Sequence, residues 1–303
     1  PGKRSTLGFQ LAGVDEAPLP ASLAEYECRN NRLAYLGLGQ DGFNAAVGAA
    51  AARYGRRRVG VLLGTSTSGI LQTEQAYRRR DPATGALPDH FHYRTTHNTY
   101  SVTDFVRTAF NLEGPAVVVS TACSSSAKVF ASAARMIAAG LIDAAIVGGV
   151  DSLCLTTLYG FNSLELLSSA PCRPYDADRN GLSIGEAAAF ILLERPAASL
   201  DADAVLLLGT GESSDAYHMS SPHPDGLGAR LPGAGSDRRL HRAAGRAGGD
   251  RGSGRCVERR AAARRVRRFQ PGSRGWRSVA GGGQRGASRT AADAGTADPL
   301  GLG

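Results

Sequence analysis

The chain has 303 residues, 42% hydrophobic and 20% charged, which is enough apolar material for one large domain or two ordinary ones. No apolar stretch approaches the roughly 20 residues of a membrane-spanning helix, no apolar run follows the charged N-terminal residues, and five cysteines make no disulfide framework, so we expect a cytoplasmic protein rather than an exported or transmembrane one. Residues 1–229 carry a net charge of −4 and residues 230–303 one of +12, so the overall charge of +8 does not by itself indicate a nucleic-acid binder.

The first 229 residues alternate between helical and strand patterns. Apolar residues at helical spacing and short buried apolar runs predict the elements in turn. We expect helices at 32–54, 70–80, 103–111 and 123–139, and strands at 59–64, 116–120, 144–148, 187–194 and 204–208. Buried strands separated by helices predict an α/β fold with a mostly parallel sheet covered on both faces.

Residues 230–303 break this pattern. They contain 17 Arg and no Lys, Ile, Met or Tyr, and no helical or alternating period continues through them. Such a composition buries too little apolar surface to offset chain entropy. We interpret this segment as an Arg/Gly/Ala-rich tail that is either disordered or the product of a shifted reading frame, and the abrupt change favours the shifted frame.

The sharpest local signal lies at Cys123. The strand pattern at 116–120 runs straight into a helical pattern, and Cys123 sits at the join. Backbone N–H groups at a helix N-terminus lack intrahelical partners, and the helix dipole favours negative charge there. A thiolate in this place is stabilised and nucleophilic, and the same N–H groups can supply half of an oxyanion hole. The alternative from these residues alone is a small buried cysteine that fills a strand–helix corner.

Cys123 lies in Thr121-Ala-Cys-Ser-Ser-Ser126, the first of four motif-like segments. The others are Gly148-Gly-Val-Asp151, a segment that runs from Arg173-Pro-Tyr-Asp176 to Gly185-Glu186, and Ser213-Ser-Asp-Ala-Tyr-His-Met-Ser-Ser-Pro222. In order and spacing they resemble the motifs of the β-ketoacyl-acyl-carrier-protein synthases, the condensing enzymes of fatty-acid and polyketide synthesis. In that family the first segment holds the nucleophile and the last lines the phosphopantetheine tunnel. The resemblance covers roughly residues 1–229.

The resemblance implies a thiolase-like fold, two related α/β halves packed as a layered α-β-α-β-α sandwich, usually as a homodimer. Here the N-terminal half is mostly present, and the C-terminal half is largely missing or replaced by the tail. The implied domains are 1–200, an N-terminal-like synthase domain, 201–229, the start of the C-terminal domain, and 230–303, the tail.

The resemblance also implies the reaction. Cys123 takes an acyl chain from acyl carrier protein as a thioester, malonyl-acyl carrier protein loses CO2, and the resulting carbanion attacks the acyl thioester. No metal or organic cofactor is bound, but the phosphopantetheine arm of the carrier is required. Phe161 matches a position near the family's acyl pocket, with an ordinary core aromatic as the alternative. Ser220 and Ser221 match positions that can hydrogen-bond the pantetheine arm, with a simple Ser-Pro turn as the alternative.

The sequence departs from the family in its second half. The family's His-Gly-Thr, Lys…Gly-His and Gly-Phe-Gly-Gly motifs are absent, and none of the six His has that context. These motifs supply the two histidines that stabilise the enolate, the supporting lysine and the second oxyanion donor. We therefore expect the chain to retain the nucleophile and to lack condensing activity.

Two other interpretations remain open. The chain can be a non-catalytic subunit paired with a complete synthase, although such subunits usually lack the nucleophilic cysteine. Alternatively, its basic tail can bind nucleic acid through phosphate contacts, but no interleaved aromatic residues or folded motif accompany it. We expect acyl carrier protein as the partner, in a homodimer or a heterodimer with a related synthase, and neither membrane nor nucleic acid.

Overall fold

The computed structural model describes residues 7–199, 204–218, 221–230 and 276–280. The chain divides into two compact units, Pro1–Arg195 with Arg274–Gly303, and Pro196–Ser273. The helices and strands named below belong to the first unit, and a helical turn at residues 227–230 belongs to the second. The tail interpretation for 230–303 lies outside the described residues, apart from Arg230 and 276–280.

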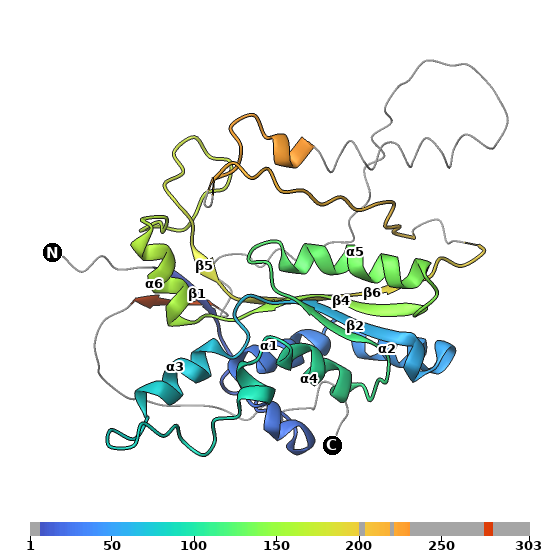
Figure 1. The fold of residues 1–303 in the computed structure, drawn as a ribbon, viewed down its shortest axis with the longest axis horizontal. Helices are drawn as coiled ribbons and strands as arrows, with labels where there is room; N and C mark the ends of the chain where they lie inside the picture. The colour runs from blue at the N-terminus through green and yellow to red at the C-terminus, as the bar shows by residue number, and fades with distance from the viewer. Residues whose placement is uncertain (1–6, 200–203, 219–220, 231–275, 281–303) are drawn as a thin grey trace. The chain divides into compact units, whose positions relative to one another are not determined.

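The first unit contains the elements labelled in Figure 1. The helices are α1 (Arg29–Leu38), α2 (Phe43–Tyr54), α3 (Ile70–Arg78), α4 (Ser101–Ala109), α5 (Ser125–Ala138) and α6 (Leu155–Ser163). The strands are β1 (Leu7–Leu11), β2 (Val59–Gly64), β3 (Ala116–Val119), β4 (Ala144–Asp151), β5 (Ile184–Gly185), β6 (Ala187–Glu194) and β7 (Trp276–Ala280). Short helical segments of other types span Ala21–Tyr26, Arg56–Arg58 and Tyr93–His97. No helix in the described part of the chain is both long and apolar enough to span a bilayer.

The main sheet has the order β3-β2-β4-β6. β2 is parallel to β3 and to β4, and Gly64 at its C-terminal end pairs with Val119 and Gly149. β6 runs antiparallel to β4 over eight residue pairs. The predicted parallel sheet is thus confirmed for three strands, and their C-terminal ends meet at one edge. A second sheet has the order β5-β1-β7.

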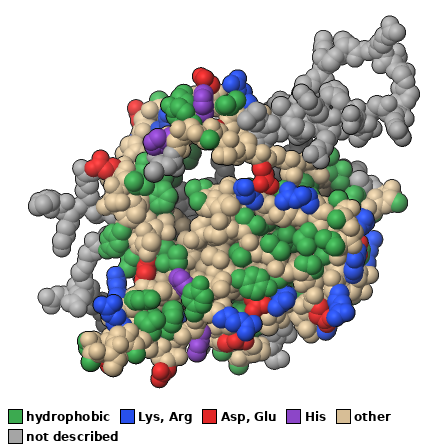
Figure 2. Space-filling model, in the orientation of Figure 1, with side chains coloured by type: hydrophobic (Ala, Val, Ile, Leu, Met, Phe, Trp, Pro, Cys, Tyr) green, Lys and Arg blue, Asp and Glu red, His purple; other side chains and the backbone are tan. Residues whose placement is uncertain are grey.

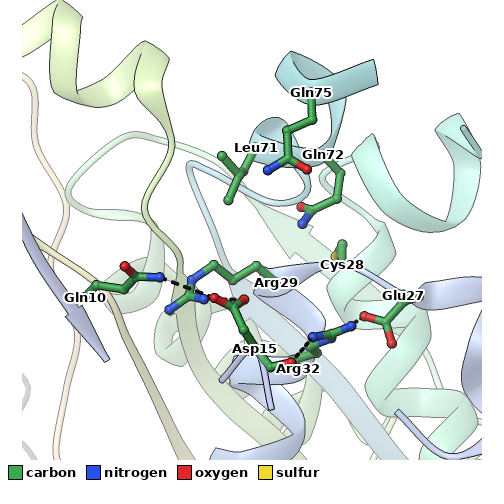
Figure 3. Close-up of a pocket in the computed structure, with 9 residues that line it drawn as sticks. All are labelled: Gln10, Asp15, Glu27, Cys28, Arg29, Arg32, Leu71, Gln72 and Gln75. Atoms are coloured by element: carbon green, nitrogen blue, oxygen red, sulfur yellow. Dashed lines mark hydrogen bonds and ion pairs between the residues drawn. The ribbon is translucent and has the colours of Figure 1, made fainter. Parts of the chain in front are cut away.

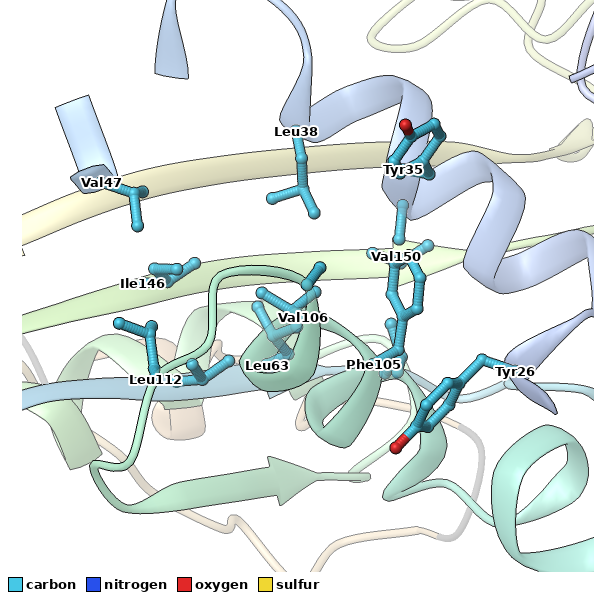
Figure 4. Close-up of a cluster of buried hydrophobic side chains, with 14 of the residues drawn as sticks. Tyr26, Tyr35, Leu38, Val47, Leu63, Phe105, Val106, Leu112, Ile146 and Val150 are labelled. Carbon is cyan, nitrogen blue, oxygen red and sulfur yellow. The ribbon is translucent and has the colours of Figure 1, made fainter. Parts of the chain in front are cut away.

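Helices cover both faces of the main sheet, as predicted. α1, α2 and α4 lie on one face and α5 lies on the other (Figure 1). Successive residues of β2 point to opposite faces, so Leu63 packs into the larger core beside Phe105 and Ile146 (Figure 4), while Leu62 packs into the smaller core under α5. Burying a side chain of this size stabilises the fold by about 1.5–3 kcal/mol.

Not all apolar side chains of this unit are covered. Figure 2 shows hydrophobic side chains gathered on the face that carries α5. α6 has no buried residue, and Tyr159 on it is 66% exposed. Ile191 on β6 is 52% exposed. Exposed apolar side chains in these numbers are typical of a surface that another chain or segment covers.

The single helix predicted at 32–54 is wrong. The structure has two helices, α1 and α2, separated by a turn at 39–42. Asp41 and Gly42 there adopt φ of +54° and +74°, in the left-handed region that a right-handed helix excludes. The glycines at 37–42 therefore interrupt a helical pattern and do not follow a strand, unlike the glycines of a dinucleotide-binding loop.

Other elements also differ from the sequence prediction. Residues 204–208, a predicted strand, have no strand partner among the described residues, and Val205 is 96% exposed. β7 lies in the segment for which no regular element was expected, and it pairs antiparallel with β1. Unpaired backbone groups on the edge of β1 provide the template for this pairing, which needs no apolar periodicity.

Candidate functional site

Cys123 occupies the turn that joins β3 to α5. β3 ends at Val119, and α5 begins at Ser125 after the N-cap residue Ser124. Cys123 is exposed, so it does not fill a corner of the core. Its place before the first turn of α5 agrees with the sequence prediction.

Ala122, directly before Cys123, has an unusual backbone conformation. Its φ is +51°, a region that costs a non-glycine residue free energy and that surrounding contacts must hold. Three donors converge on its carbonyl oxygen: the Ser125 N–H at 3.2 Å, the Ser125 Oγ at 2.6 Å and the Ser66 Oγ at 3.0 Å. Ser125 Oγ also accepts from the Thr121 N–H at 2.8 Å. Hydrogen bonds therefore hold the backbone of the turn both before and after Cys123.

The backbone amides of this turn are partly engaged. The Ser124 N–H donates to the Thr121 carbonyl at 3.3 Å, and the Ser125 N–H donates to Ala122. The Cys123 N–H has no acceptor among the described residues. Of these three amides, the one at Cys123 is therefore the donor that a developing oxyanion can use.

Two glycines allow α5 to approach the sheet this closely. A Cβ at Gly64 would lie 2.4 Å from the carbonyl carbon of Ser125 and 2.4 Å from the nitrogen of Ser126. A Cβ at Gly149 would lie 2.5 Å from the Cβ of Ser126. Both glycines lie at the C-terminal ends of their strands, so the sheet edge itself makes room for the first turn of α5.

Asp151, the last residue of β4, organises the loop that follows β2. Its Oδ1 accepts from the N–H groups of Ser66 at 2.7 Å and Thr67 at 3.1 Å. It also accepts from the hydroxyls of Thr65 at 3.3 Å and Thr67 at 3.1 Å. Because Ser66 also contacts Ala122, this carboxylate is linked to the Cys123 turn through one residue.

Side chains also hold the segment that leads from β4 into α6. Glu74 on α3 accepts from the N–H groups of Leu155 at 2.9 Å and Thr156 at 2.7 Å, and from the Thr156 hydroxyl at 2.6 Å. A carboxylate at a helix N-terminus satisfies free N–H groups and complements the helix dipole. Since α6 buries no residue of its own, Glu74 is an important anchor for it. Phe161 lies on α6 and is half-buried.

Of the other predicted site residues, only Phe161 lies in the same compact unit as Cys123. No hydrogen bond or ring contact in the described part of the chain joins Phe161 to Cys123. Ser221 is exposed and belongs to the second compact unit, and Ser220 lies outside the described residues. The proposed roles of these three residues stay predictions.

Sequence reasoning missed the supporting residues Ser66, Glu74 and Ser125. A signal for the first was present, because the polar run Gly64-Thr-Ser-Thr-Ser-Gly69 follows a buried strand, and in parallel sheets sites gather at the C-terminal ends of strands. Glu74 lies in an ordinary amphipathic helix, and none of its neighbours in the sequence indicates that it contacts the N-terminus of α6.

A second feature is a polar cavity of about 430 Å³ beside α1 and α3 (Figure 3). The buried Arg29 lies on one side of it and forms ion pairs with Glu186 and Asp15, both at 2.5 Å. Burial lowers the pKa of Arg29, but hydrogen bonds and charge from Glu186, together with Asp15, raise it above its ordinary value. Arg32 also lines the cavity and is paired with Glu27, so neither arginine of this lining is an unpaired charge for an anionic ligand.

A buried cysteine in the lining of this cavity should make the stability of the fold depend on pH. Cys28 lines the cavity and is 2% exposed, and burial raises the pKa of its thiol to about 12. In the unfolded chain this thiol ionises near pH 8.5, so its contribution to stability is complete below that pH and is lost as the pH rises towards 12. Each rise of one pH unit between these two pKa values lowers the free energy of unfolding by at most about 1.4 kcal/mol. Urea unfolding at pH 8 and pH 10.5 measures this, and Cys28→Ala should reduce the pH dependence. Equal pH dependence in both proteins would contradict the assignment.

A metal site is not indicated. In the part of the chain that the structure describes, no three His, Cys, Asp or Glu side chains cluster as metal ligands do. His97, one of three histidines in the loop after α3, instead lies 2.6 Å from the hydroxyl of Thr73 through its Nδ1, and burial lowers its pKa.

Comparison with known protein families gives a match over the part of the chain that holds the site. Residues 43–198, about half of the chain, match the family described as "Beta-ketoacyl synthase, N-terminal domain". The matched range includes Cys123, the loop after β2, Asp151 and Glu186.

Individual proteins agree with this match. The chain is 38% identical over 129 residues to 3-oxoacyl-[acyl-carrier-protein] synthase 2 of Rhizobium meliloti, which covers 39% of this chain and 31% of that synthase. It is 31% identical over 193 residues to the chloroplastic 3-oxoacyl-[acyl-carrier-protein] synthase I of Hordeum vulgare, covering 56% of this chain and 39% of that one. The chain therefore spans only a third or so of these relatives' length.

Solved structures show the same fold. A ketosynthase (ApeO) in complex with its chain length factor (ApeC) from Xenorhabdus doucetiae matches with a TM-score of 0.61 at 42% identity, over 71% of this chain and 52% of that one. The ishigamide ketosynthase/chain length factor matches with a TM-score of 0.61 at 22% identity, over 74% of this chain and 56% of that one.

Proposed function

The chain belongs to the β-ketoacyl synthase family and has its thiolase-like fold, and on this premise we propose that Cys123 is the acyl-accepting nucleophile of this chain. The observation that carries the proposal is the exposed thiol in a clamped turn at the N-terminus of α5. The substrate is an acyl chain on the phosphopantetheine arm of acyl carrier protein. We propose a cytoplasmic protein that binds no metal or organic cofactor.

The proposed chemistry is a thioester exchange. The Cys123 thiolate attacks the carbonyl carbon of the acyl-pantetheine thioester, and the negative charge that develops on the carbonyl oxygen is stabilised by the Cys123 N–H and the dipole of α5. The intermediate then collapses, the bond to the pantetheine sulfur breaks, and the pantetheine leaves as a thiolate that takes up from solvent the proton that the Cys123 thiol had released. The products are acyl-Cys123 and free carrier.

The acyl-transfer step is tested directly by mass spectrometry. Incubation with an acyl-pantetheine thioester should add one acyl group, which maps to the peptide containing Cys123. Cys123→Ala should abolish the adduct, because no other thiol occupies the turn. Cys172→Ser is the matched control, since Cys172 is also free and exposed but lies outside the turn. Equal acylation of Cys123→Ala and the wild type would overturn the nucleophile assignment.

We propose further that this chain does not complete the condensation. The sequence contains no His-Gly-Thr, Lys…Gly-His or Gly-Phe-Gly-Gly motif, so it lacks the groups that stabilise the enolate formed on loss of CO2. Purified protein given acyl- and malonyl-acyl carrier protein should therefore accumulate acyl-enzyme without β-ketoacyl product. Measurable product from this chain alone would refute this part of the proposal.

A second candidate function is that of a partner subunit. Two of the matching structures are described as a ketosynthase with a chain length factor, and this chain exposes apolar side chains around α5 and α6. In this role it would pair with a complete, related synthase. Retention of Cys123 favours the catalytic proposal. Co-purification with a complete synthase, together with no acylation of Cys123, would favour the partner role instead.

A further inference from the structure

We propose that Ser66 and Asp151 are positioning residues for Cys123, and that they act through the backbone of Ala122. The inference rests on the proposed function, because it assigns the alignment of the nucleophile to two side chains that form no hydrogen bond with Cys123 in the described part of the chain. It depends on a continuous set of contacts from the end of β4, through the loop after β2, to the turn before α5.

The first link is Asp151 to the loop. One carboxylate oxygen, Oδ1, accepts from two N–H groups and two hydroxyls of residues 65–67, at 2.7 to 3.3 Å. The Ser152 N–H adds a return contact, 2.9 Å to the Thr67 hydroxyl. Charge-assisted hydrogen bonds of this kind are about twice as strong as neutral ones. They determine where the Ser66 side chain lies, and β4 supplies the rigid support.

The second link is Ser66 to Ala122. The Ser66 hydroxyl donates to the Ala122 carbonyl at 3.0 Å and lies 3.5 Å from the Ser125 hydroxyl. A φ of +51° at an alanine persists only where neighbouring contacts hold it, and the orientation of this carbonyl depends on the two peptide planes that meet there. Ser125 holds the carbonyl from within α5, and Ser66 holds it from outside.

The consequence falls on Cys123, the next residue. If the Ala122 carbonyl is released from Ser66, the peptide between Ala122 and Cys123 rotates more freely. The thiol and the Cys123 N–H then spend less time aligned with the N-terminus of α5. Electrostatic stabilisation by a helix terminus falls off within one turn, so a thiolate that leaves this position loses it. A lower nucleophilicity of Cys123 follows, without any change in the global fold.

Ser66 is exposed, so its hydroxyl can be removed without opening a cavity. Ser66→Ala should therefore leave the unfolding temperature of the full chain unchanged. Ser66→Thr restores a hydroxyl at the same position. Ser163→Ala is a matched control, because Ser163 Oγ makes the same type of bond to a helix carbonyl, that of Gly160 at 2.7 Å, on α6.

The experiment measures the alkylation rates of Cys123 and Cys172 by iodoacetamide in the same molecules, by peptide mass spectrometry. Cys172 is an exposed internal reference, so the ratio of the Cys123 rate to the Cys172 rate does not depend on the folded fraction or the reagent concentration of each sample. We expect Ser66→Ala to lower the ratio about fivefold, Ser66→Thr to restore it, and Ser163→Ala to leave it unchanged. Asp151→Ala should lower the ratio similarly. In the double variant, Ser66→Ala with Asp151→Ala, the ratio should fall no further than in the more impaired single variant, because both substitutions break the same set of contacts.

The outcomes separate this inference from the proposed function. If wild-type Cys123 reacts no faster than Cys172, the activated nucleophile itself is overturned. If Cys123 reacts faster but the ratio is the same in Ser66→Ala, the positioning role is overturned and the nucleophile stands. If the losses of the two single variants add in full in the double variant, the proposed link from Asp151 through Ser66 to Ala122 is also overturned, because the two substitutions then act independently.

Discussion

Replacing Glu186 by Ala is expected to lower the free energy of unfolding by about 3 kcal/mol, because the buried Arg29 loses its buried partner and keeps only the exposed Asp15. The Glu186 side chain is fully buried and accepts four hydrogen bonds: from Arg29 Nε at 3.0 Å and Nη2 at 2.5 Å, and from the N–H groups of Leu11 at 2.7 Å and Leu153 at 3.1 Å. These donors lie on α1, at the end of β1 and after β4. One side chain therefore joins three parts of the unit, and its loss leaves all four donors without this acceptor.

Urea unfolding monitored by circular dichroism measures the change. The matched control is Glu113→Ala, whose partner Arg57 is 85% exposed, so its loss should cost less than about 1 kcal/mol. A double variant, Arg29→Met with Glu186→Leu, should recover only the part of the loss that comes from the unpaired charge, because the N–H groups of Leu11 and Leu153 still lack the carboxylate acceptor. Similar small losses in Glu186→Ala and Glu113→Ala would show that the buried pair contributes no more than a surface pair.

The main-sheet strands and the place of Cys123 could be predicted because their signals are local. β2, β3 and β4 are continuous apolar runs bounded by small or polar residues, and such runs are typical of a parallel sheet buried on both faces. The switch from a strand pattern to a helical one places Cys123 at a helix N-terminus without reference to any distant residue. Glu186 lies in one of the four motif-like segments, whereas nothing in the sequence around Arg29 marks it as the partner of that carboxylate.

The supporting contacts of the site could not be predicted, because they join residues far apart in the chain. Asp151 and Ser66 are separated by 85 positions, and Glu74 and Thr156 by 82. Their pairing depends on the sheet register, in which Gly64 lies beside Gly149. The break between α1 and α2 was missed for a different reason. Apolar residues at helical spacing lie on both sides of it, and the sequence prediction joined them across the intervening Gly39-Gln-Asp-Gly42, where the backbone turns.

Gly64→Ala is expected to destabilise the unit by about 3 kcal/mol and to reduce the reactivity of Cys123 at the same time. The new Cβ would lie 2.4 Å from backbone atoms of Ser125 and Ser126, and backbone cannot rotate away as a side chain can. Either β2 or the first turn of α5 must move. Because Ser125 holds Ala122, movement of that turn misaligns Cys123 as well. Urea unfolding and the alkylation ratio of Cys123 to Cys172 measure the two effects in one preparation.

Gly48→Ala is the matched control for this substitution. Gly48 lies inside α2 with no atom within 4 Å of the position of its added Cβ, so alanine there should stabilise the helix by about 0.5–1 kcal/mol and leave Cys123 unaffected. Replacing glycine by alanine should thus lower the free energy of unfolding at Gly64 and raise it at Gly48. If Gly64→Ala unfolds at the wild-type urea concentration and keeps the wild-type alkylation ratio, close packing of α5 on Gly64 does not hold the nucleophile turn. If stability falls but the ratio is retained, the packing stabilises the unit, and the orientation of Cys123 depends on the contacts of Ser66 and Ser125 alone.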